Sequence, residues 1–169
     1  DIDRKIVELR AALDGVVNAH PQWEAQLRGD VMDHWRSPVP ESVVSTGGAT
    51  IAAADENSYL ASGKIPASEV YEVTLPASKE ATVCFRLDAL THPSHTKGST
   101  GRAANGNFVL TEFEVLAASA DAPEEWKPVK VATASADYQQ TGWLVAAAID
   151  GVSTGKGGWA VDGHIRHEN

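Results

Sequence analysis

Two carboxylates, Glu112 and Asp150, have the residue type and the surroundings that a metal site requires. Glu112 interrupts an apolar strand pattern, where a buried carboxylate must find a partner or reach water. Asp150 begins the turn-like stretch 150–155, which can supply one carboxylate, a hydroxyl and several carbonyl oxygens. Calcium takes about six to eight oxygen ligands of these kinds, so we predict a structural calcium ion bound by both residues. Alternatively, Asp150 only forms a turn, and Glu112 pairs with Arg86 or Arg102.

A second group of residues has the chemistry for binding a carbohydrate. Sugar recognition needs aromatic faces for the C–H groups of the ring and a few fixed polar groups beside them. The long predicted loops 91–106, 117–127 and 137–158 carry or adjoin side chains of both kinds. We expect the ligand-binding residues to be Trp143, Tyr138, Trp126, Arg102, Asn105 and His95. A tryptophan in a loop more often packs into the core than binds a sugar. The alternative that these tryptophans are structural therefore stays open.

The sequence lacks the usual signatures of catalysis. Ser94 and His95 are adjacent, but no nucleophile-elbow sequence surrounds them. No glycine-rich motif for cradling phosphate is present. Nothing in the pattern places two carboxylates across a cleft, as a glycosidase needs. We therefore interpret the chain as non-enzymatic.

Residues 1–30 have the apolar spacing of a helix that packs lengthwise on another helix. Alternating spacings of four and three, as in an a/d heptad seam, separate Ile2, Ile6, Leu9, Leu13 and Val16. Because proline disrupts helical hydrogen bonding, Pro21 predicts either a kink in this α-helical arm or one helix that ends near Asn18 and a second that starts at Pro21. The partner helix is not in this sequence. It comes from a larger parent or from another molecule, or else the arm lies against the β domain.

From residue 31 onward the pattern changes to short β-strands. Runs rich in valine, isoleucine, threonine and aromatic residues alternate with turn residues about every ten positions, which is typical of an all-β sandwich. The predicted strands are 34–38, 42–45, 50–53, 58–61, 70–75, 82–90, 107–116, 129–134 and 158–161. Because 107–116 is apolar on both faces, we expect it to be a central strand buried on both sides. The sequence predicts one β-sandwich domain over 31–169.

The charge of the chain excludes two classes of partner. Fourteen basic and twenty-three acidic residues give a net charge of -9. Nucleic acids and anionic membranes both need a basic surface for their phosphates, so we expect neither as a partner. No uninterrupted apolar run approaches the roughly 20 residues of a transmembrane helix, and we expect no membrane span.

Several short strings occur in one order along the chain: Trp35-Arg36-Ser37-Pro38, Gly101-Arg102-Ala103, Asn105-Gly106-Asn107-Phe108, Thr111-Glu112-Phe113 and Gly158-Trp159-Ala160. This order resembles the domain embedded in large planctomycete-type proteins that also carry cytochrome-c-like regions. The resemblance implies a piece of a larger exported protein, in the periplasm or at the cell surface. Its partners would include the rest of the parent, which would supply the missing helix and the C-terminal strands. Because the sequence has no Cys-x-x-Cys-His motif, we expect no haem on this piece.

Two segments, 110–115 and 134–159, more distantly resemble the discoidin-like, galactose-binding jelly-roll domains. In those domains an Asp-Gly loop and a Glu on a late strand commonly hold a structural calcium. The resemblance therefore implies the same metal role for Asp150 and Glu112.

Together these patterns predict a mainly β fold, a jelly-roll (galactose-binding-like) β-sandwich with an N-terminal α-helical arm and without its last strands. We expect a non-catalytic module that binds carbohydrate, as a polysaccharide or glycan. The alternative is a structural spacer or protein-interaction domain without a small ligand. An exposed aromatic residue in a loop cleft would favour the module, whereas burial of all five tryptophans would favour the spacer.

Overall fold

The computed structural model describes residues 35–155 and 157–163, together with residues 2, 4–6, 8 and 25. Most of the predicted helical arm over 1–30, including the kink at Pro21, therefore lies outside the described residues. So do the last six residues of the predicted sandwich domain, 164–169. Within the described part, no helix is both long enough and apolar enough to cross a membrane.

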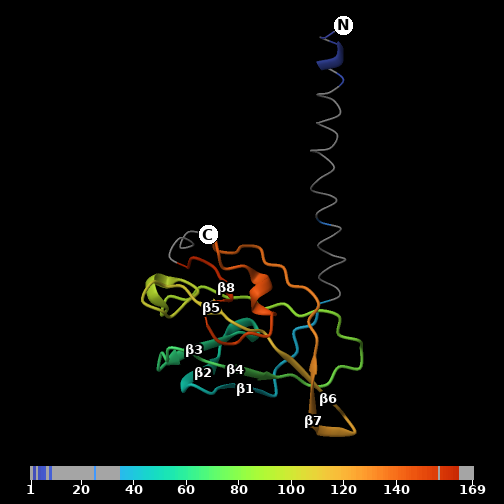
Figure 1. Cartoon of the computed structure of the whole chain (residues 1–169), viewed down its shortest axis with the longest axis vertical. Helices are drawn as coiled ribbons and strands as arrows, with labels where there is room; N and C mark the ends of the chain where they lie inside the picture. Colours follow the sequence, from blue (N-terminus) through green and yellow to red (C-terminus); the bar gives the residue numbers. More distant parts are fainter. Residues whose placement is uncertain are drawn as a thin grey trace.

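The described residues are mainly β, as the sequence predicts (Figure 1). The strands are β1 (Ser42–Ser45), β2 (Ala49–Ala53), β3 (Tyr59–Gly63), β4 (Tyr71–Thr74), β5 (Val109–Leu110), β6 (Val115–Ser119), β7 (Ala122–Val129) and β8 (Trp159–Ala160). Three short 3-10 helices lie between them: η1 (Asp55–Asn57), η2 (Thr96–Gly98) and η3 (Val145–Ala148). All the pairings are antiparallel and two-stranded: β1 with β4, β2 with β3, β5 with β8, and β6 with β7.

The turn between β1 and β2 is built around the carboxylate of Glu69. Its oxygens accept hydrogen bonds from the backbone N–H groups of Gly47 (2.5 Å) and Ala49 (3.4 Å). Removal from water raises the pKa of Glu69, but the hydrogen bonds from Gly47, Ser45, Ala49 and Val70 lower it more, so that the pKa lies below its ordinary value of 4.5. A Cβ on Gly47 would come within 2.7 Å of the same carboxylate. A side chain at position 47 would therefore displace the Glu69 carboxylate from its hydrogen bonds in this turn.

The buried core lies at the C-terminal end of the described chain. Trp159 and Val161 are buried together with Ala148 of η3, and Phe108 and Leu110 pack against them. The ring of Phe108 meets Trp159 edge-on, with centroids 5.5 Å apart, which is a favourable geometry for two aromatic rings. The indole N–H of Trp159 donates to the carbonyl of Tyr138 (2.8 Å), which satisfies its polar group inside the cluster.

The predicted central strand 107–116 is only partly present. Residues 109–110 form β5 and residue 115 begins β6, while the stretch between them carries no strand. The N–H of Phe113 in that stretch bonds instead to the carbonyl of Ala148. Val109 is exposed and Leu110 is half-buried, so the expectation of burial on both faces was wrong. The reason is that β5 pairs with β8 over only two residues before the chain turns away.

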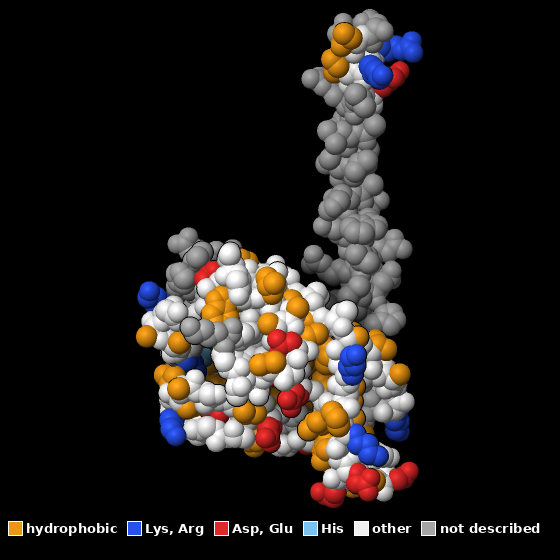
Figure 2. Space-filling model, in the orientation of Figure 1, with side chains coloured by type: hydrophobic (Ala, Val, Ile, Leu, Met, Phe, Trp, Pro, Cys, Tyr) orange, Lys and Arg blue, Asp and Glu red, His pale blue; other side chains and the backbone are white. Residues whose placement is uncertain are grey.

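Several other predicted elements differ from the structure. Residues 35–38 of the predicted strand 34–38 form no strand, and only Val129 of the predicted strand 129–134 lies in one, at the end of β7. The predicted strand 82–90 has no strand pairing among the described residues, and its side chains are exposed. The predicted loop 117–127 is a β-hairpin instead, because β6 and β7 pair across a turn at residues 120–121. Figure 2 shows apolar side chains over this hairpin, at the lower right, with acidic side chains at its tip. Trp126 therefore lies on a strand rather than in a loop.

Candidate functional site

The loop 99–107 is held closed by hydrogen bonds around one buried serine. Ser99 is fully buried, and its hydroxyl donates to the carbonyl of Gly106 (2.5 Å). The N–H of Gly101 bonds to the same carbonyl (3.1 Å). A Cβ on Gly101 would overlap the backbone carbonyl of Asn107. The glycines thus allow two backbone segments of the loop to approach closely. This close approach determines the position of Arg102.

Asn107 connects this loop to two distant parts of the chain. Its side-chain oxygen accepts from the N–H groups of Val161 and Gly163, both at 3.3 Å. Its amide nitrogen donates to the side-chain oxygen of Gln140 (2.8 Å). The loop is therefore joined to the end of the core cluster, so its position depends on β8 being in place.

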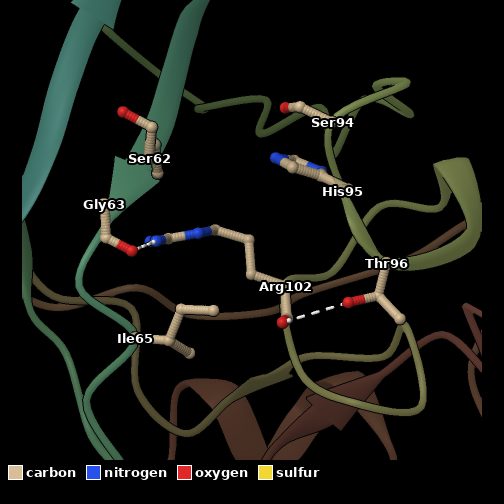
Figure 3. Close-up of a pocket in the computed structure, with 8 residues that line it drawn as sticks. Ser62, Gly63, Ile65, Ser94, His95, Thr96 and Arg102 are labelled. Carbon is tan, nitrogen blue, oxygen red and sulfur yellow. Dashed lines mark hydrogen bonds between the residues drawn. The ribbon is translucent and has the colours of Figure 1, made fainter.

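A pocket lies between the end of β3 and the loop residues 94–102 (Figure 3). It has a volume of about 210 Å³. Its lining comes from Ala61, Ser62, Gly63, Ile65, Ser94, His95, Thr96 and Arg102. We call it the Arg102 pocket.

Arg102 is held in place at both its backbone and its side chain. Its Nη2 donates to the carbonyls of Gly63 (2.7 Å), the last residue of β3, and of Lys64 (2.9 Å), which follows it. The hydroxyl of Thr96 donates to the carbonyl of Arg102 (3.2 Å). Figure 3 shows the side chain reaching across the pocket from the loop to Gly63. The guanidinium is therefore positioned before any ligand arrives.

His95 presents an unused hydrogen-bond acceptor. Its Nδ1 lies 3.1 Å from the carbonyl of Ser99. Because a carbonyl only accepts, Nδ1 carries the proton, and Nε2 of the neutral ring is left with a lone pair. Nε2 is buried and has no hydrogen-bond partner among the described residues. A buried polar atom without a partner is unfavourable by about 1–3 kcal/mol. Because Nε2 is closed to solvent, a ligand hydroxyl would donate to it only after the imidazole ring or a neighbouring side chain shifts.

The structure brings together two of the six predicted ligand-binding residues, His95 and Arg102. Asn105 lies in the same loop, but its side-chain oxygen accepts from the N–H of Asn107 (3.1 Å) and so supports the turn. The pocket also uses Ser62 and Thr96, which the sequence reasoning did not select. Ser62 comes from β3, far away in sequence, so no local pattern pointed to it; Thr96 is next to His95, and that adjacency was the available signal.

The three predicted aromatic ligand residues lie elsewhere. Tyr138 packs against the core cluster, and its hydroxyl donates to Asp162 (3.0 Å). Trp143 is half-buried in the turn before η3. Trp126 is 51% exposed on β7. No aromatic ring other than the His95 imidazole lines the Arg102 pocket. An exposed tryptophan is therefore present, although it lies on a strand and not in a loop cleft.

The two predicted metal ligands are close to each other. The carboxylate of Glu112 accepts from the N–H of Gly151 (2.9 Å), the residue after Asp150. The Asp150 carboxylate accepts from the N–H of Val152 (2.9 Å), which makes a tight turn. Of the two arginines considered as partners of Glu112, Arg86 pairs with Asp88 (2.8 Å), and Arg102 binds carbonyls.

A larger hollow of about 320 Å³ lies beside Glu112. Its walls combine the apolar residues Phe113, Val115, Val129 and Ile149 with the charged residues Glu112, Glu114 and Lys130. No group of three or more His, Cys, Asp or Glu side chains suited to a metal ion occurs within the residues that the structure describes. The Arg102 pocket is the better candidate for a polar ligand, because a fixed cation and a free acceptor both line it.

Comparison with known proteins finds no family model, no curated protein and no solved structure that matches this chain.

Proposed function

We propose that this chain is a non-catalytic binding module that holds one sugar residue of a glycan in the Arg102 pocket. One observation carries the proposal: His95, whose Nε2 has no hydrogen-bond partner among the described residues, lines the same pocket as the fixed guanidinium of Arg102. A sugar hydroxyl both donates and accepts hydrogen bonds. It can therefore donate to Nε2 with its proton and accept from the guanidinium with its oxygen.

The size and lining of the pocket also support a small hydroxylated ligand. Pockets for drug-sized molecules have volumes of about 300–1,000 Å³, whereas this one has about 210 Å³. A ligand the size of one sugar ring suits that volume. The hydroxyls of Ser62, Ser94 and Thr96 add polar groups, and Ile65 offers an apolar contact for the C–H face of the ring.

The wider proposal is that the module is a jelly-roll β-sandwich within a larger exported protein, periplasmic or at the cell surface. The remainder of that protein, including a helix and further strands, is its partner. The mainly β structure and its antiparallel strand pairs support the sandwich. The net charge of -9 agrees with a well-solvated surface.

A glycan-binding measurement on the full chain and on His95→Phe tests the proposal. Phenylalanine keeps a ring of similar shape but removes both the Nε2 acceptor and the Nδ1 bond to the carbonyl of Ser99. We expect at least a tenfold loss of affinity, which corresponds to about 1.4 kcal/mol. Circular dichroism should show that the variant keeps the wild-type fold. Full affinity in a folded His95→Phe variant would contradict the proposal.

The exposed tryptophan on the hairpin provides the competing outcome. Trp126→Ala should leave glycan affinity unchanged, because Trp126 does not line the Arg102 pocket. If Trp126→Ala abolishes binding while His95→Phe does not, the glycan binds on β7 instead. If no glycan in a broad panel binds, the chain acts as a spacer or protein-interaction domain.

A structural calcium ion at Glu112 and Asp150 belongs to the same proposal. The hydrogen bond from Gly151 to Glu112 supports it, because the bond brings the carboxylate to the turn that begins at Asp150. The two carboxylates supply hard oxygen ligands, and the turn offers backbone carbonyls of the kind that calcium binds.

Thermal unfolding with and without calcium tests this part. We expect calcium to raise the melting temperature of the wild type, because an ion that binds only the folded state stabilises it. Asp150→Asn should reduce that increase. A melting temperature that is the same in millimolar calcium and in excess chelator would exclude a structural calcium ion.

A further inference from the structure

We infer that the sugar in the Arg102 pocket is a uronic acid, a sugar whose ring carries a carboxylate. The inference rests on the proposed function and adds the chemical class of the ligand. It follows from the charge of the pocket compared with the charge of the whole chain, and from the donors of Arg102 that have no partner.

The Arg102 pocket has the opposite charge to the rest of the protein. The chain has a net charge of -9, with twenty-three acidic residues. None of the described residues that line the pocket is acidic, and Arg102 gives this lining a full positive charge. The negatively charged surface of the protein repels anions, whereas the positive charge in the pocket attracts them. The pocket is therefore a local site for an anion.

The charge of Arg102 has no neutralising partner within the described part of the chain. The ion pairs found there join Arg4 to Glu8, Arg86 to Asp88 and Lys127 to Glu125. Arg102 instead binds two backbone carbonyls, and both of these bonds come from Nη2. Carbonyls fix the direction of the guanidinium but leave its charge uncompensated. A carboxylate on the ligand would compensate it.

The remaining donors of Arg102 are free to bind that carboxylate. A guanidinium has five N–H groups, and those on Nε and Nη1 have no hydrogen-bond acceptor among the described residues. Hydrogen bonds from an arginine to a carboxylate are stronger than those between neutral groups. Because the guanidinium is already fixed by Gly63 and Lys64, little side-chain freedom is lost when the ligand binds.

His95 distinguishes a sugar acid from a simple anion. With Nδ1 donating to the carbonyl of Ser99, Nε2 has no hydrogen-bond partner among the described residues, and in that tautomer it accepts from a donor such as a sugar hydroxyl. A carboxylate offers no proton to this atom. The ligand that satisfies both groups therefore carries a carboxylate for Arg102 and a hydroxyl for His95 on one small ring, as a uronic acid does.

Titration calorimetry with a matched pair of sugars tests the inference on the wild-type chain. Galactose and galacturonic acid differ only in that the acid has a carboxylate in place of the hydroxymethyl group. We expect galacturonic acid to bind at least tenfold more tightly. Raising the salt concentration should weaken the binding of galacturonic acid and leave that of galactose nearly unchanged, because salt screens the charge interaction.

Two variants with the same substitution locate the effect. In Arg102→Gln the preference for galacturonic acid over galactose should fall from at least tenfold to about one. Arg86→Gln removes an exposed arginine that is already paired with Asp88, and it should keep the full preference. If Arg102→Gln does not fold, the comparison of galactose with galacturonic acid on the wild-type chain still tests the inference.

Each other outcome separates this inference from the proposed function. Equal binding of the two sugars would overturn the uronic acid and leave the sugar module standing. No binding of either sugar, or of any other glycan, would overturn both. Acetate binding as tightly as galacturonic acid would show a simple anion site and overturn the inference. A galactose sulfate that binds more tightly than galacturonic acid would assign the acidic group to sulfate and also overturn it.

Discussion

Two stretches with similar apolar patterns have opposite environments in the structure. Val83, in the segment 82–90, is 90% exposed, whereas Val161, just after β8, is 4% exposed. Both sequences predict a strand. The difference is that glycines flank Val161: a Cβ on Gly158 would lie 2.5 Å from the carbonyl of Leu110, and a Cβ on Gly163 would overlap the carbonyl of Gly106. Close approach of backbones buries the second stretch, and the first has no such neighbour among the described residues.

This contrast bears on the Arg102 pocket, because the pocket depends on the packed region. Asn107 joins the loop 99–107 to Val161 and Gly163. Changes in the core cluster should therefore alter both stability and ligand binding. Changes at the exposed Val83, in the segment 82–90, should alter neither. The following predictions test that difference, beginning with the largest expected effect.

The largest effect is expected from Trp159→Ala. Trp159 is 8% exposed and contacts Phe108, and its N–H satisfies the carbonyl of Tyr138. Truncating a buried tryptophan typically lowers the free energy of unfolding by about 3–5 kcal/mol. The matched change Trp126→Ala, on the exposed strand β7, should cost under about 1 kcal/mol. Urea unfolding of both variants measures this, and equal losses would contradict the contrast.

The next effect is expected from Gly101→Ala. The added Cβ would overlap the carbonyl of Asn107 and force the loop apart. Such overpacking typically costs about 1–3 kcal/mol, and the displaced loop should also weaken ligand binding. Gly157→Ala is the control, because a Cβ there meets no atom within 4 Å. Chemical denaturation and sugar titration of both variants check the prediction, which fails if Gly101→Ala behaves as Gly157→Ala does.

A smaller effect is expected from shortening the two compared valines. Val161→Ala should lower the free energy of unfolding by about 2 kcal/mol, because it removes two buried methyl groups and leaves a cavity in their place. Val83→Ala should change it by under about 0.5 kcal/mol, because its side chain is already in solvent. A large loss in Val83→Ala would show that the segment 82–90 is packed in solution.

The smallest effect is expected from Glu69→Gln, and it depends on pH. The folded-state pKa of Glu69 is below 4.5, so the carboxylate stabilises the folded state above pH 4.5, and this stabilisation is lost as the pH falls through the folded-state pKa. The melting temperature of the variant should thus be lower than that of the wild type at pH 7, with the gap closing in acid. Glu72→Gln on exposed β4 should show no gap at either pH. A gap for Glu69→Gln that persists in strong acid would show that charge is not the cause.

Part of the candidate site could be predicted because it depends on short-range sequence. Arg102 and His95 were selected from their loop and their chemistry, and both line the pocket. The glycine-rich run around Gly106 predicted a tight turn, and Gly106 has a φ of +77°, which favours glycine. Glu112 was correctly placed as a carboxylate that needs a partner, and it accepts a hydrogen bond from Gly151.

The sequence by itself determined the mainly β character, the tight glycine turns and two of the polar residues of the Arg102 pocket, His95 and Arg102, because each depends on residues close together in the chain. Only the tertiary structure decided that Gly63 meets Arg102 across 39 residues, that β6 and β7 form a hairpin and that the segment 82–90 remains exposed. Strand pairing and burial depend on which distant backbone lies alongside. An alternating apolar pattern predicts that one face of a strand is buried, but it does not identify the segment that packs against that face.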